Sequence, residues 1–127
     1  MKITVNPDTK SSTFGYASEG EYELRVSSCV QKKKQGGEHP YIEWMFEFSD
    51  KDTRPVEDGT QLGSIFEITT LKPNAQFALR NITDALGIEW GNFDTEEVKG
   101  LTCKAKVTVG ENNGKKRNEV SRFIPAK

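Results

Sequence analysis

Two basic triplets are the residues of this chain best suited to binding an anion. Each lies between two stretches in which polar and apolar residues alternate as in a β-strand. The first triplet is Lys32, Lys33 and Lys34, and the second is Lys115, Lys116 and Arg117. Six of the 18 Lys and Arg residues lie in these triplets, which leaves 12 basic residues against 19 acidic ones elsewhere. Such concentrated cations suit a phosphate backbone, provided that the fold brings both segments to one groove.

A protein that binds single-stranded nucleic acid also needs exposed aromatic rings on which bases can stack. Tyr41 opens a predicted strand beside the first triplet, on the side opposite to the predicted core, so it is the preferred stacking residue. Trp44, Phe46 and Phe48 share the other side of that strand and are expected in the core. Further candidates for phosphate contacts, on outward faces, are Arg25, Lys104 and Lys106.

Two other pairs of aromatic residues lie outside the predicted strands. Trp90 and Phe93 occur in a glycine-flanked link and are expected to cap one end of the core. Phe14 and Tyr16 lie near the N-terminus, where they either fold over a ligand or pack on the domain.

Three glutamates weigh against nucleic acid. The alternation predicts Glu43, Glu47 and Glu67 on the outward side of the second and third strands. Carboxylates in the middle of a binding face repel phosphates, so a nucleic acid would have to follow the rim near the triplets. Two alternatives therefore stay open. Lys-rich hairpin tips also aid solubility and protect strand edges, and an acidic outer face suits a protein-interaction module.

Hydrophobic periodicity predicts five strands and one helix. The expected strands span residues 21–31, 41–49, 61–70, 102–109 and 118–124. In the third strand, Leu62, Phe66 and Ile68 are expected on the core side. In the last strand, Val120 and Phe123 are out of phase with strict alternation, which predicts a bulge or an edge.

The period changes to three and four residues between positions 73 and 87, which indicates a helix. Asn74 is the expected N-cap, and Gly87 is the expected left-handed residue at the other end. Asp94 and Glu97 have the spacing of a capping box, which predicts one more helical turn.

This order of elements is that of a mainly β, five-stranded OB-type barrel, which has its helix between strands 3 and 4. An immunoglobulin-type sandwich has no place for the helix, and a ferredoxin-like fold needs one directly after its first strand. The two loops that border the ligand face of an OB barrel are those that contain the triplets. Residues 1–19 are expected to form a flexible arm with a short strand at 2–5, followed by one domain over 20–127.

Composition indicates a small soluble domain, with a mean hydropathy of −0.68 and 34% hydrophobic residues. The sequence has no apolar run of the roughly 20 residues that span a membrane, and no signal-peptide pattern. We therefore expect a cytoplasmic protein with no membrane partner. Cys29 and Cys103 are expected to be buried free thiols.

Signals for catalysis and metal binding are weak. His39 is the only histidine and lies in a glycine-containing loop, so no pair for nucleophilic catalysis is apparent. Residues 110–115 have too few positions between their glycines for a phosphate-binding loop. Residues 50–62 lack the glycine and the final carboxylate of a calcium loop. We expect no enzyme activity, no cofactor and no metal.

Several short motifs together resemble a known family. They are Gly20-Glu21-Tyr22-Glu23-Leu24, Ala85-Leu86-Gly87, Gly100-Leu101 and Asn118-Glu119-Val120, with a strand end near Pro125. Over residues 20–125, the chain resembles short phage-encoded proteins of replication and recombination modules, which are OB-fold single-stranded DNA-binding proteins. The resemblance implies single-stranded DNA as ligand, replication or recombination proteins as further partners, and a homo-oligomer. It assigns no ligand residue.

Overall fold

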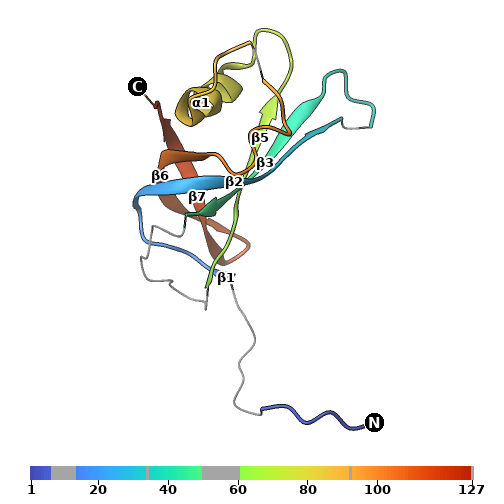
Figure 1. Cartoon of the computed structure of the whole chain (residues 1–127), viewed down its shortest axis with the longest axis vertical. Coiled ribbons are helices and arrows are strands. Elements are labelled where there is room, and N and C mark those ends of the chain that lie inside the picture. The colour runs from blue at the N-terminus through green and yellow to red at the C-terminus, as the bar shows by residue number, and fades with distance from the viewer. Residues whose placement is uncertain (7–13, 34, 50–60, 92, 127) are drawn as a thin grey trace.

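The computed structural model describes residues 1–6, 14–33, 35–49, 61–91 and 93–126. The elements are β1 (Phe14–Gly15), β2 (Gly20–Lys32), β3 (Tyr41–Phe48), β4 (Gln61–Leu62), β5 (Ile65–Thr70), α1 (Phe77–Leu86), β6 (Thr102–Asn112) and β7 (Lys115–Ile124). Five antiparallel strands in the order β5-β3-β2-β6-β7 form a nearly closed barrel (Figure 1). The single helix lies between its third and fourth strands, so the predicted OB-type barrel is confirmed.

The barrel interior is filled by one side of each strand. Leu24 and Val26 from β2 and Trp44 and Phe46 from β3 are at most 1% exposed. The Trp44 and Phe46 rings lie nearly parallel, with centroids 5.8 Å apart. The indole Nε1 of Trp44 donates a hydrogen bond to Oγ1 of Thr69 at 3.0 Å. The polar atom of the largest core side chain is therefore satisfied.

The third predicted strand is interrupted. Leu62 packs against the core as predicted, but in the second part, β5, the inward side is the opposite of the one predicted. Residues 63–64 separate β4 from β5. Within β5, Ile65 and Thr69 are buried at 2% exposure each, whereas Phe66 and Ile68 are 58% and 65% exposed. A two-residue break uncouples the alternation on its two sides, so a phase counted across it does not hold.

The helix begins later than predicted and has a different N-cap. Asn74 adopts a φ of 71°, which belongs to a turn and not to the extended backbone of an N-cap. Gln76 occupies the cap position before Phe77, without a side-chain cap bond. At the other end, Gly87 has a φ of 76°, so the predicted left-handed cap is confirmed. The buried residues of α1 are Leu79, Ile82, Thr83 and Ala85.

The link between α1 and β6 closes one end of the core mainly through Phe93. Its ring centroid lies 5.7 Å from that of Trp44. Trp90 is 36% exposed, so it covers the core less than predicted. After Asp94 the chain makes one hydrogen-bonded turn, in which the Glu97 N–H donates to the Asp94 carbonyl at 3.1 Å and the Glu96 N–H to Asp94 Oδ1 at 2.9 Å, and no helix continues from it.

The β6–β7 hairpin has the predicted turn and the predicted bulge. Asn113 and Gly114 have φ values of 53° and 79°, as a tight hairpin turn with two left-handed residues requires. The pairing shifts after Lys106, so Ser121 is the extra residue of a β-bulge. Because β7 begins at Lys115, the second triplet lies in a strand and not in the loop.

The N-terminal residues differ from the predicted arm. Residues 1–6 form no strand, and the short strand of this region is β1, which pairs with β4 in parallel. Tyr16 and Ala17 are buried at 9% and 0% exposure. The Asn118 side chain accepts a hydrogen bond from the Ala17 N–H and donates one to the Ala17 carbonyl, both at 2.8 Å. This end of the predicted arm is therefore fixed on the barrel beside β7.

Candidate nucleic-acid interface

The outward sides of β2, β3 and β5 carry three cross-strand rows of side chains. Directly opposed residues of an antiparallel sheet lie on the same face, so the register defines each row. Lys32, Tyr41 and Thr70 form the first row; Val30, Glu43 and Ile68 the second; Ser28, Met45 and Phe66 the third. We call these nine residues the three-row face. Successive rows lie roughly 7 Å apart along a strand.

The three-row face exposes apolar side chains. Val30, Phe66 and Ile68 are 44%, 58% and 65% exposed, and Tyr41 and Met45 are half-buried beside them. Exposed apolar residues grouped on one face make this face a candidate contact surface. Because more than half of Phe66 is exposed, its ring is accessible to a stacking base.

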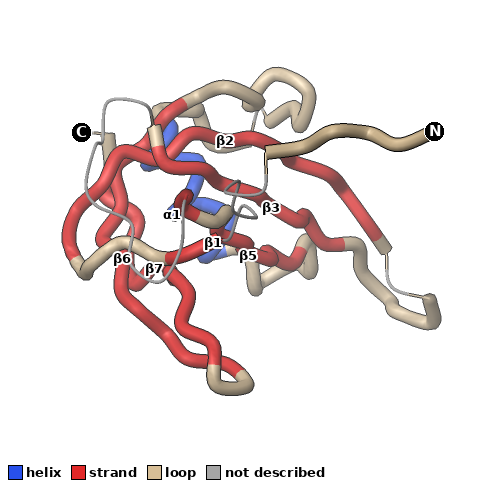
Figure 2. The backbone as a smooth tube through the Cα atoms, turned by 90° about the horizontal axis from the view of Figure 1, so that it is seen from below, coloured by secondary structure: helices blue, strands red, loops and turns tan. Residues whose placement is uncertain are grey.

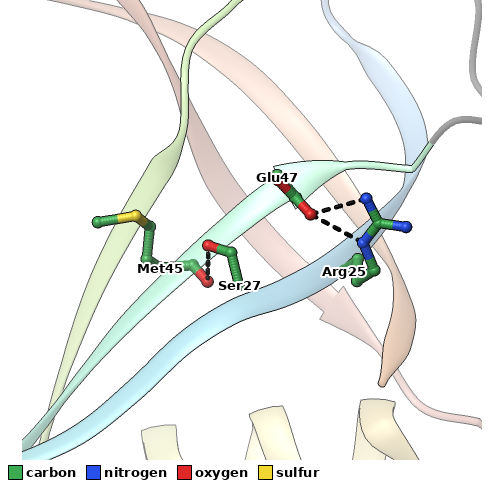
Figure 3. A network of polar contacts seen from close by, with 4 residues as sticks. All are labelled: Arg25, Ser27, Met45 and Glu47. Atoms are coloured by element: carbon green, nitrogen blue, oxygen red, sulfur yellow. Dashed lines mark hydrogen bonds and ion pairs between the residues drawn. The ribbon is translucent and has the colours of Figure 1, made fainter. Parts of the chain in front are cut away.

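Two of the three glutamates are balanced by cations of β2. Glu43 Oε2 lies 3.1 Å from Lys32 Nζ. Glu47 Oε1 lies 2.7 Å from Arg25 Nη2 and accepts a hydrogen bond from Arg25 Nε at 2.8 Å (Figure 3). Ion pairs as exposed as these contribute little to stability. Their effect is to reduce the negative field that the sequence predicts in front of this face.

The third glutamate, Glu67, is not on the three-row face, so its predicted outward placement is wrong. The alternation of β5 places it on the side of Ile65 and Thr69. It lines a cavity of about 320 Å³ between β5, α1 and β7. Burial raises the pKa of Glu67, and the nearby charge of Glu119 raises it further. This carboxyl group therefore belongs to the seam between β5 and β7.

The first triplet borders the first row. Lys32 ends β2 opposite Tyr41, and Lys33 is exposed directly after it. Lys34 lies outside the described residues. The phosphate contacts predicted for Lys32 and Lys33 would thus lie at the Tyr41 end of the three-row face.

The second triplet borders the third row. Lys116 and Arg117 line a surface cavity of about 370 Å³ together with Met45 and Phe66. The Lys116 Nζ lies 5.9 Å from the centroid of the Tyr16 ring, within cation–π range. Tyr16 is buried and therefore packs on the domain. The Phe14 side chain, for which the same two alternatives were predicted, is outside the described part of the structure.

The remaining basic residues of the second triplet are open to solvent. Lys115 is exposed next to the hairpin turn. Arg117 Nε lies 3.7 Å from Glu119 Oε1, and the two side chains are 61% and 52% exposed. Such a loose surface pair leaves the guanidinium available to a phosphate oxygen.

The two hairpin tips project from different sides of the barrel and do not meet (Figure 1; Figure 2). The segments next to the barrel, not the tips, border the three-row face. The three-row face therefore has cations at both ends: Lys32 belongs to its first row with Lys33 directly after it, and Lys116 and Arg117 lie beside its third row.

The secondary candidates lie elsewhere or are already paired. Lys104 and Lys106 are exposed on β6, opposite Glu23 and Glu21 of β2. They do not join the three-row face. Arg25 points outward beside it, but its guanidinium is held by a glutamate of β3.

Other chemistry finds little support in this structure. Within the described ranges, no group of three or more His, Cys, Asp or Glu residues could hold a metal ion. Burial raises the pKa of the free thiols of Cys29 and Cys103 to about 12, so both stay protonated at neutral pH. The helix in the described part of the chain is too short and too polar to cross a membrane.

Sequence reasoning missed two residues of this region. Both sides of β5 carry apolar or β-branched residues, so no pattern in the sequence separates the exposed Phe66 from the buried Ile65. Asn118 is 8% exposed and holds the segment that carries Tyr16. Asparagine is depleted in strands, so its place as the first residue of the predicted strand 118–124 is the signal that could have identified it.

No protein-family model matches this chain, and no curated protein matches it. The resemblance to phage single-stranded DNA-binding proteins therefore stays a prediction from short motifs. The barrel and the three-row face do not depend on it.

Proposed function

We propose that the protein binds single-stranded DNA without sequence preference, in phage DNA replication or recombination. The observation that carries this proposal is the placement of the exposed Phe66 in one cavity with Lys116 and Arg117. An accessible ring beside cations supports stacking of a base while its phosphates are neutralised. The phage context rests on the motif resemblance alone.

The distribution of charge supports the same function. Cations lie at both ends of the three-row face, and its middle row consists of Val30, Glu43 and Ile68. Phosphates would be bound at the ends, and bases would lie over the exposed apolar side chains of the middle row, Val30 and Ile68. A duplex hides its base faces in the stack, so it could use the cations but not these apolar side chains. Single strands should therefore bind more tightly than duplex.

Fluorescence anisotropy with a labelled dT strand of about 30 nucleotides tests the proposal. The titration is run at about 50 mM and about 150 mM salt, with unlabelled duplex as competitor. We expect binding that weakens with salt, by a slope near −0.7 for each phosphate contact, and that duplex competes poorly. Absence of binding at about 50 mM salt would contradict the proposal, because phosphate contacts are strongest there.

A protein-interaction surface is the second candidate, and the exposed aliphatic residues favour it. Val30 and Ile68 offer no ring for a base but suit the apolar core of a protein interface. A partner held in this way, including a second copy of the chain, would remain bound as salt rises. Light scattering at low and high salt tests self-association. A monomer at both, together with salt-sensitive dT binding, would contradict this alternative.

A further inference from the structure

Glu43 occupies an unusual position for a carboxylate on a face proposed to bind DNA. It is the only acidic residue of the three-row face, all of whose residues are described. It lies in the middle row between Val30 and Ile68, and its side chain is 33% exposed. A charged group among apolar neighbours costs desolvation energy when a ligand covers it, unless the ligand supplies a hydrogen-bond donor.

Two rings lie within reach of Glu43. Tyr41 precedes it by two residues on the same side of β3, roughly 7 Å away. Phe66 is its diagonal neighbour on β5, at roughly 7–8 Å, a separation that aromatic and long side chains bridge. A base stacked on either ring would therefore turn one edge toward the Glu43 carboxylate.

The carboxylate is positioned and retains capacity to accept hydrogen bonds. Lys32 Nζ lies 3.1 Å from Oε2 and holds the side chain toward the first row. A carboxylate has two oxygens with about four lone-pair sites and donates nothing. It can thus accept a hydrogen bond from an amino group while it stays paired with Lys32, and it repels carbonyl oxygens.

We propose that Glu43 selects for bases that present an amino group at this point of the three-row face, so that cytosine binds better than uracil. Cytosine presents its N4 amino donor where uracil presents the O4 acceptor, and acidic side chains accept from cytosine N4 in known base readout. This inference rests on the proposed single-strand binding and adds a base-edge contact to it. The result is a compositional bias at one subsite, not recognition of a sequence.

The test compares dC and dU strands of about 30 nucleotides. The two bases have the same ring and size and differ along one edge, where cytosine has the N4 amino donor and an N3 acceptor and uracil has the O4 acceptor and an N3–H donor. Anisotropy titrations are run at about pH 8, where cytosine is unprotonated. For the unmodified chain we expect roughly 10-fold tighter binding of dC, the scale of one charge-assisted hydrogen bond. In Glu43→Gln the ratio should fall to within about twofold, since an amide both donates and accepts.

Glu47→Gln is the matched control. It removes the same charge from the same strand, at the ion pair with Arg25, outside the three rows. We expect the dC preference to persist in this variant. Loss of the preference in both variants would show an effect of net charge and would overturn the inference.

Two further results would overturn the assignment of Glu43. One is equal affinity of the unmodified chain for dC and dU. The other is a Glu43→Gln variant that binds both strands more tightly by the same factor, which would make Glu43 only a counter-ion of Lys32. Either leaves single-strand binding intact, whereas failure to bind dC, dU and dT at low salt would refute the proposed function itself.

Discussion

Two walls of the same barrel use charge in different ways. On the wall formed by the first half of β2 with β6, opposite charges face each other across the strands, with Glu21 opposite Lys106 and Glu23 opposite Lys104. We call this the charged wall. On the three-row face, the large outward side chains include Phe66, and its one carboxylate is paired with a lysine of the neighbouring strand.

Under the proposed function, this difference marks the three-row face as the wall that meets a ligand. Opposite charges directly across an antiparallel strand pair contribute roughly 0.2–1 kcal/mol per pair to sheet formation. Exposed apolar area costs about 25 cal/mol per Å² relative to burial. The fold itself gains nothing from exposing Phe66 and Ile68, and the proposed function gives their exposure a reason.

The largest expected effect on dT affinity comes from removing charge at the Lys116 and Arg117 end of the three-row face. Lys116→Gln with Arg117→Gln should weaken dT binding roughly 30-fold at about 50 mM salt and reduce the salt slope by about 1.4, as for two lost phosphate contacts. Lys104→Gln with Lys106→Gln removes the same charge from the charged wall and should change affinity less than about threefold. Anisotropy titrations at several salt concentrations measure both.

The comparison between the walls fails if the two double variants behave alike. Equal weakening would mean that DNA responds to the net charge of the domain and not to the three-row face. An unchanged salt slope in Lys116→Gln with Arg117→Gln would exclude those residues as phosphate contacts.

A smaller effect is expected on stability. Asn118→Ala leaves the buried Ala17 N–H and carbonyl without their partner, at a cost of about 1–2 kcal/mol in the free energy of unfolding. Ser121→Ala removes an exposed hydrogen bond to the Lys106 carbonyl and should cost less than about 0.5 kcal/mol. Urea denaturation compares the two. Equal costs would show that Asn118 is not what fixes Tyr16 and Ala17 on the barrel.

Local signals in the sequence predicted most of the fold. The turn at Asn113 and Gly114 and the helix end at Gly87 each depend on a left-handed backbone that few residues adopt, so the residue type identifies the structure. The alternation in β2 and β3 identified their buried sides because each has one clearly apolar side. The order of the predicted strands and helix then agreed with few known folds.

The candidate site was less predictable because it depends on register and phase. The triplets are visible as charge clusters, but the pairing of Lys32 with Glu43 depends on how β2 and β3 align. The exposure of Phe66 depends on the break before β5, whose only sequence signal is Gly63 inside the predicted strand. Tertiary contacts decide these features, so sequence alone placed Tyr41 at the site and Phe66 in the core.

The smallest expected effect is on stability, at the seam between β5 and β7 that adjoins the three-row face. Burial raises the pKa of Glu67, so its ionised form destabilises the fold at neutral pH. The contribution of protonated Glu67 to stability is fully present below the pKa that this group has in the unfolded chain. It is lost as pH rises through the higher pKa of the folded chain. Glu67→Gln should therefore raise the free energy of unfolding at pH 7, by less than about 1 kcal/mol.

The gain in the free energy of unfolding from Glu67→Gln should shrink as pH falls toward about 4, because Glu67 of the unmodified chain then becomes protonated in both the folded and the unfolded state. Denaturation curves at several pH values measure it, with the exposed Glu89→Gln as control. A pH-independent difference would contradict a buried carboxyl at the seam. Altered dT binding in Glu67→Gln would contradict its separation from the three-row face.

The most direct test of the account compares two exposed phenylalanines of the same chain. Phe66 is 58% exposed on the three-row face, and Phe77 is 73% exposed on α1, outside it. Phe66→Ala should weaken dT binding about 10-fold, the scale of one lost base–ring stack, and Phe77→Ala should leave it unchanged. Affinities for dT that fall equally in both variants, or in neither, would contradict the assignment of the three-row face as the site where bases stack.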